Sequence, residues 1–154
     1  MTTFKEGDPF PDIALTSLDG EAVRVSDLPG RKAVFFYPKD DTPGCTTEAK
    51  DFSALLDEFS KANVSVLGVS KDSPRRHRNF IDKHGLTVPL ATDAAEGGLS
   101  DALGIWTEKR MYGRSFTGMV RSTFLVGEDD RIERVWTKVK VKDHAKDVLD
   151  VVRA

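Results

Sequence analysis

The sequence predicts an α/β fold, a three-layer sandwich in which helices cover both faces of a mixed central sheet. Two short runs, Ala33–Tyr37 and Val64–Ser70, are largely apolar without strict alternation, which is typical of strands buried on both faces. Each is followed by a segment with helical signals, and two further strands and a helix end the chain.

The first element is an N-terminal β-hairpin. Its strands are Ile13–Thr16 and Val23–Val25, and the turn-forming pair Asp19-Gly20 separates them.

Two helices follow the two buried strands. The first, over about 43–62, is indicated by apolar residues spaced i, i+3, i+4 and i+7, namely Phe52, Leu55, Leu56 and Phe59. The second, Pro74–His84, has Ser73 as its expected N-cap and Gly85 as its expected C-terminal stop.

The last part of the chain predicts strands at Thr123–Val126 and Ile132–Trp136 and a closing helix at Asp143–Val152. The segment Leu90–Val120 has a weaker pattern, and we expect only a short helix within Leu99–Ile105 before a glycine-rich loop. From Ala33 onward the order β-α-β-α-β-β-α is the thioredoxin-like arrangement, and we expect residues 1–154 to form one domain.

Composition excludes several classes of function. With 31% charged residues and a formal net charge of -2, the chain is typical of globular proteins and carries no general signal for nucleic acid. Its longest apolar run is far shorter than the ~20 residues of a membrane-spanning helix. The first ten residues do not resemble a signal peptide, so we expect a cytoplasmic protein.

Two local patterns have weak functional interpretations. The basic run Arg75–Arg78 could bind phosphate, but the flanking Asp72 and Asp82 favour a solvated helix face. Cys45 and the three histidines lack the spacing of metal ligands, so we expect no metal and no cofactor.

Cys45 is the only cysteine and the main candidate for chemistry. It follows the buried strand Ala33–Tyr37 and opens the next helix, at the sheet edge where α/β proteins bind ligands. With Thr42 as N-cap and Pro43 first, Cys45 is the third helical residue. Free amides, the Thr42 hydroxyl and the helix dipole would then favour the thiolate, which is the reactive form of cysteine. Gly44 would let a substrate approach the backbone.

The stretch from Phe36 to Ala49, FYPKDDTPGCTTEA, resembles the active-site signature of the peroxiredoxins. It is most similar to their bacterioferritin comigratory protein, or peroxiredoxin Q, subgroup. Further similarity extends through nearly the whole chain, in Gly7–Asp12, Trp106–Gly113, Arg121–Leu125, Trp136–Lys140 and His144-Ala145.

The resemblance implies a role for each matched residue. Cys45 would be the peroxidatic cysteine, which attacks the peroxide and becomes a sulfenic acid. Thr42 would hydrogen-bond to both the sulfur and the peroxide, and Arg121 would stabilise the thiolate and polarise the substrate. The remaining roles are solvent shielding by Pro38, peroxide binding by the amides of Gly44 and Cys45, and orientation of the arginine by Glu48. An ordinary acidic residue in the first helical turn is an equal interpretation of Glu48.

The sequence departs from the subgroup at the second cysteine. Lys50 stands where many relatives have a resolving cysteine, and Pro74–His84 contains none. We therefore expect an external thiol to resolve the sulfenic acid, either thioredoxin or glutathione with glutaredoxin. We expect a monomer or weak dimer. The main alternative is a non-enzymatic redox sensor or chaperone that uses the same cysteine.

Overall fold

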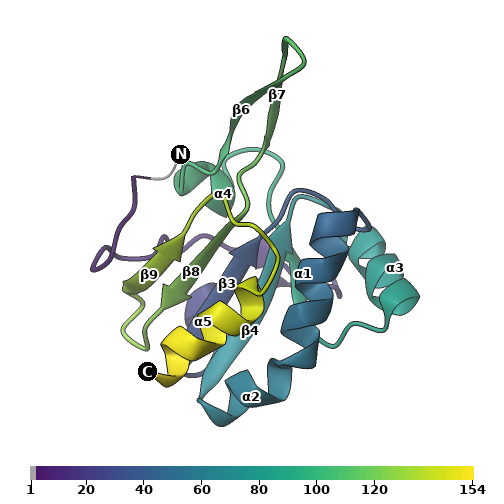
Figure 1. Cartoon of the computed structure of the whole chain (residues 1–154). Coiled ribbons are helices and arrows are strands. Elements are labelled where there is room, and N and C mark those ends of the chain that lie inside the picture. Colours follow the sequence, from purple (N-terminus) through teal and green to yellow (C-terminus); the bar gives the residue numbers. More distant parts are fainter. Residues whose placement is uncertain (1–2) are drawn as a thin grey trace.

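A seven-stranded mixed sheet forms the centre of the computed structural model, which describes residues 3–154 (Figure 1). The strand order is β2-β1-β5-β4-β3-β8-β9. β3 and β4 are parallel, as are β4 and β5, whereas β3–β8 and β8–β9 are antiparallel. The strands are β1 (Leu15–Thr16), β2 (Ala22–Val23), β3 (Arg31–Phe36), β4 (Val64–Ser70), β5 (Leu90–Thr92), β8 (Ser122–Val126) and β9 (Ile132–Trp136). The predicted α/β class with a mixed sheet is confirmed.

The sheet has a separate hydrophobic core on each face. Alternate residues of β3 point to opposite sides, so Phe35 belongs to one core and Phe36 to the other. The first core is covered by α1 (Pro43–Ala54), α2 (Leu56–Lys61), α3 (Pro74–His84) and α5 (His144–Arg153). The N-terminal segment and α4 (Leu99–Ala102) cover the second. These layers are the predicted sandwich.

The first long helix is broken, which corrects the expectation of one helix over 43–62. α1 ends at Ala54, Leu55 has φ -99° and ψ 3°, and α2 begins at Leu56. The apolar stripe crosses the break because Phe52 and Phe59 pack into the same core. Side-chain spacing therefore predicted the buried face correctly but did not reveal the interruption of the backbone.

The segment Leu90–Val120 contains three strands that the sequence pattern did not predict. Besides β5, it holds the antiparallel hairpin of β6 (Trp106–Met111) and β7 (Arg114–Met119), which projects from the body in Figure 1. The expected glycine-rich loop was wrong. The turn Tyr112-Gly113 has positive φ at both residues, as a tight hairpin turn requires. Most residues of the two strands are exposed, so no buried face imposes an alternating pattern.

Smaller differences lie at the predicted boundaries. The N-terminal hairpin exists, but β2 ends at Val23 and Val25 begins a short 3₁₀ helix, Val25–Asp27. In the basic run, Arg76 and Arg78 are exposed and paired with aspartates, whereas His77 is buried. Within residues 3–154, no helix is long and apolar enough to cross a membrane.

Candidate active site

Cys45 is the third residue of α1, as the sequence predicted, and its side chain is enclosed. Pro43 is the first helical residue, and the Thr46 amide donates to the Thr42 carbonyl at 2.8 Å. The helix start leaves the Gly44 and Cys45 amides without partners inside the helix. Cys45 is 1% exposed and packs in the core beneath α1. The sulfur thus belongs to the first turn of a helix and is shielded from bulk water.

Arg121 lies against this sulfur because of the sheet register. Phe36, the last residue of β3, pairs with Ser122, the first residue of β8. Arg121 precedes Ser122 and therefore lies beside the chain that leaves β3 and enters α1. Its Nη2 is 3.2 Å from Cys45 Sγ. Arg110 and Arg114, which composition alone does not distinguish from Arg121, are exposed on the projecting hairpin.

Glu48 holds the other end of the guanidinium. It lies one helical turn after Cys45 on the same face of α1, and Arg121 Nη1 donates to its Oε1 at 2.7 Å. Glu48 is 1% exposed, which excludes its interpretation as an ordinary solvated residue at a helix start. Burial raises the pKa of the carboxyl from 4.5 to about 7, although the charge of Arg121 acts in the opposite direction. Glu48 Oε2 has no hydrogen-bond partner among residues 3–154.

The structure gives a reason for glycine at position 44 that differs from the predicted approach of a substrate. A Cβ atom built at Gly44 would lie 3.3 Å from Arg121 Nη2. The missing side chain therefore makes room for the guanidinium beside the helix start.

Thr42 and Pro38 lie in the segment between β3 and Cys45, where the sequence places them. Thr42 has the extended backbone of an N-cap, but its side chain accepts no capping hydrogen bond. Its hydroxyl instead donates to the Lys39 carbonyl at 2.8 Å, so Thr42 is the N-cap residue, as predicted, but it does not cap the helix through its side chain. No hydrogen bond joins Thr42 to Cys45 in the described chain. Pro38 follows β3 directly and is exposed.

A second polar cluster, which the sequence did not reveal, lies under the loop between β3 and α1. The Tyr37 hydroxyl donates to Asp40 Oδ1 at 2.6 Å, and His77 Nδ1 lies 2.7 Å from Asp40 Oδ2. His77 Nε2 is 3.1 Å from the Ala91 carbonyl, which can only accept. We call Tyr37, Asp40 and His77 the buried triad. It ties the loop before Cys45 to α3 and β5.

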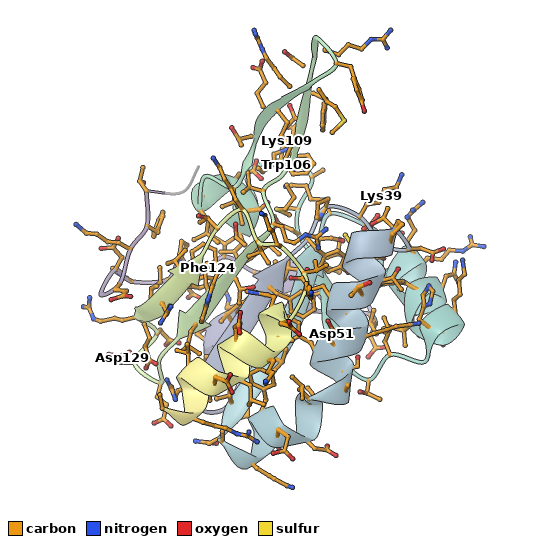
Figure 2. All side chains as sticks on the ribbon, viewed as in Figure 1. Lys39, Asp51, Trp106, Lys109, Phe124 and Asp129 are labelled. Carbon is orange, nitrogen blue, oxygen red and sulfur yellow. The ribbon has the colours of Figure 1, made fainter. Side chains whose placement is uncertain are left out.

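Two lysines near Arg121 were also missed as site residues. Lys109 extends from β6 at the base of the hairpin (Figure 2), and Lys138 follows β9. Together with Arg121 they border one cavity. Lys109 belongs to the tryptophan-containing stretch noted in the sequence, but no sequence signal indicated that Lys138 lies beside Arg121.

Residues 6–135 match the model of the AhpC/TSA family. The chain belongs to the AhpC/TSA family. It is 41% identical over 152 residues to peroxiredoxin Bcp of Bacillus subtilis, covering 98% of this chain and 96% of that one. Peroxiredoxin Bcp of Xanthomonas campestris is 49% identical over 121 residues, covering 79% of this chain and 75% of the relative.

Solved structures agree with these relatives. A peroxiredoxin Q of Xylella fastidiosa superposes with a TM-score of 0.91 at 37% identity, covering 99% of this chain and 98% of that chain. The bacterioferritin comigratory protein of Xanthomonas campestris superposes with a TM-score of 0.86 at 43% identity, covering 92% and 89%. Its structures are described in connection with alkyl peroxide reduction. The thioredoxin-like fold and the peroxiredoxin Q resemblance are therefore confirmed, and the chain is a thiol peroxidase.

Proposed function

We propose that Cys45 carries the peroxidase reaction and that Arg121 stabilises its charge. The observation that supports this most directly is the 3.2 Å contact between Arg121 Nη2 and Cys45 Sγ at the start of α1. In the first step the thiolate attacks one peroxide oxygen and the O–O bond breaks. The sulfur keeps that oxygen as a sulfenic acid, and the other oxygen leaves, takes a proton and becomes water or an alcohol.

The groups around the sulfur supply position and charge for this step. The amides of Gly44 and Cys45 would hold the peroxide oxygens, and Arg121 would offset the negative charge that gathers on the leaving oxygen. Glu48 fixes the direction of the guanidinium through Nη1, which leaves Nη2 for the sulfur. Thr42 and Pro38 border the same loop, and we assign them peroxide contact and solvent shielding.

The second half of the cycle requires a thiol from another molecule. Cys45 is the only cysteine, and the exposed Lys50 occupies the position where many relatives have a partner. An external thiol attacks the sulfenic sulfur, forms a mixed disulfide and releases water. A second thiol then releases reduced Cys45. Thioredoxin, or glutathione with glutaredoxin, would supply these thiols. The protein would be a single domain, a monomer or weak dimer, and would act in the cytoplasm.

The test is a steady-state peroxidase assay with the thioredoxin and glutathione systems side by side, on the wild type and on Cys45→Ser. We expect repeated turnover by the wild type with at least one system and background rates for the variant. Thr47→Ser is the matched control, because Thr47 is exposed on the same helical turn. A protein oxidised only once, with no turnover under either system, would favour the redox-sensor alternative and contradict the enzyme cycle.

A further inference from the structure

A cavity of about 460 Å³ opens beside Arg121, at the junction of the hairpin and the main sheet. Its volume lies within the range of small-molecule sites, roughly 300–1,000 Å³. The wall consists of Thr107, Glu108, Lys109, Val120, Arg121 and Lys138. Arg121 therefore contacts Cys45 with its guanidinium and also forms part of the cavity wall.

Three of the cavity's wall residues are cationic, and two of them, Lys109 and Lys138, have no anionic partner in the described chain, whereas Arg121 is paired with Glu48. Lys109 is half-buried, and its Nζ donates to the neutral carbonyl of Met119. Lys138 has no hydrogen bond or ion pair within the described chain. Glu108 is the only acidic wall residue, against the three cationic ones. Burial and the nearby charge of Arg121 lower the pKa of Lys109, while the Cys45 sulfur acts in the opposite direction.

The backbone fixes Lys138 at this position. Lys138 has φ 48°, in the left-handed region, which costs a non-glycine residue roughly 1–2 kcal/mol. The next amide, that of Val139, donates to the Arg121 carbonyl at 3.0 Å. The strained residue is thus held against the strand end that carries Arg121.

We propose that this cavity binds the carboxylate of a low-molecular-weight thiol, with Lys109 and Lys138 as its cationic ligands. The inference rests on the proposed function, in which an external thiol must reach the sulfenic acid of Cys45. The bound thiol attacks the Cys45 sulfur, an S–S bond forms, the S–O bond breaks and the hydroxyl leaves as water. A second molecule of the same thiol then reduces the mixed disulfide, which yields the free Cys45 thiol and the oxidised disulfide of the small thiol.

The burial of Cys45 favours a thiol over an anionic peroxide as the occupant. The helix amides and Arg121 can hold the two reacting oxygens, so the oxidation step needs no second anchor. Resolution has to bring another sulfur to a residue that is 1% exposed in a chain with no other cysteine. A small anionic thiol can enter a concave cationic cavity, and its charge would hold it next to Arg121.

The test compares three thiols of similar size and different charge: mercaptopropionate, mercaptoethanol and cysteamine. Cys45 is first converted to the sulfenic acid with one equivalent of hydrogen peroxide, verified by mass. The rate of mixed-disulfide formation is then measured by quenched mass spectrometry. In Lys138→Gln and Lys109→Gln, we expect the mercaptopropionate rate, relative to the mercaptoethanol rate, to fall about tenfold from the wild-type ratio. Higher ionic strength should produce the same selective loss in the wild type.

Lys140→Gln is the matched control, because Lys140 is exposed two residues beyond Lys138 and does not line the cavity. An unchanged thiol ratio, an equal loss for all three thiols, or the same loss in Lys140→Gln would overturn the proposal. So would a charge effect confined to oxidation by a carboxylate-bearing hydroperoxide, since the cavity would then serve the oxidant. If no sulfenic acid forms at all, the proposed function itself fails. If the sulfenic acid forms but the thiol rates do not depend on the lysines, only the proposed thiol site fails.

Discussion

Two polar groups flank the start of α1, and they differ in how completely they are paired. In the buried triad of Tyr37, Asp40 and His77, the charged and polar groups are paired with one another, and Asp40 Oδ2, which accepts no hydrogen bond, still lies 2.7 Å from His77 Nδ1. The group around Arg121 is open: the guanidinium reaches the sulfur, and two lysines border a cavity without an anionic partner from the protein.

This difference indicates that one group of polar side chains stabilises the fold and that the other acts on a ligand or a reacting group. A buried and satisfied network contributes to a unique fold, because each group has exchanged water for a protein partner. Charges that are gathered in a cavity without partners remain available to a ligand or to a transition state. We therefore expect changes in the buried triad to affect stability, and changes around Arg121 to affect rates.

The largest effect is expected on stability, from Asp40→Ala. Removal of this carboxylate leaves the Tyr37 hydroxyl and His77 Nδ1 buried without their partner, which costs about 3 to 5 kcal/mol. Urea unfolding monitored by circular dichroism measures the change. Asp19→Ala removes an exposed partner of Arg78 and should cost less than about 1 kcal/mol. Equal losses in the two variants would contradict the comparison, as would a folded Asp40→Ala protein in which Cys45 reacts far more slowly with peroxide.

Arg121→Gln should instead slow the reaction of Cys45 and have little effect on stability. Loss of a preorganised donor at a developing charge typically slows a reaction about 100- to 1,000-fold, and we expect such a decrease for sulfenic acid formation. Stopped-flow mixing with hydrogen peroxide, followed by mass analysis, measures the rate constant. Arg110→Gln, on the exposed part of β6, is the control. A wild-type rate in Arg121→Gln would remove this residue from the mechanism.

The sequence predicted the parts of the molecule that obey local rules. Pro43 and the apolar run of β3 were sufficient to place Cys45 as the third residue of a helix at a sheet edge. The hairpin of β6 and β7 escaped prediction because its strands face solvent and lack a buried side. The break at Leu55 escaped because the apolar spacing continues across it.

The remaining site features depend on contacts between distant segments. The register of β3 and β8 brings Arg121 to Cys45, 76 residues away in the chain. Composition treats Arg110, Arg114 and Arg121 alike, and only the resemblance to peroxiredoxins singled out Arg121, the one that contacts Cys45. Tyr37, Asp40 and Lys138 belong to stretches that resemble the family, but nothing local showed that Asp40 would meet His77 or that Lys138 would lie beside Arg121, because these contacts join distant segments.

Glu48 shares a feature with each of the two groups, since it is buried like the triad and contacts Arg121. Its pKa is raised from 4.5 to about 7, so between these values the folded protein binds a proton that the unfolded chain has lost. Stability from this group is therefore greatest below pH 4.5 and is lost as the pH rises through 7. Glutamine mimics the protonated acid. Glu48→Gln should thus be more stable relative to the wild type at pH 8 than at pH 5, by about 2 kcal/mol, in parallel urea unfolding experiments.

The same titration should also affect the rate of Cys45 oxidation. An ionised Glu48 competes with the thiolate for the positive charge of Arg121, because both contact the same guanidinium. The wild-type rate constant should therefore show an inflection near pH 7 that Glu48→Gln lacks, and the effect should be smaller than that of Arg121→Gln. Asp51→Asn, on the same helix and outside the contact with Arg121, should keep the inflection but move it to slightly lower pH, because the charge of Asp51 contributes to the raised pKa of Glu48. If Glu48→Gln shifts stability with pH but leaves the rate profile unchanged, Glu48 is a structural partner of Arg121 only.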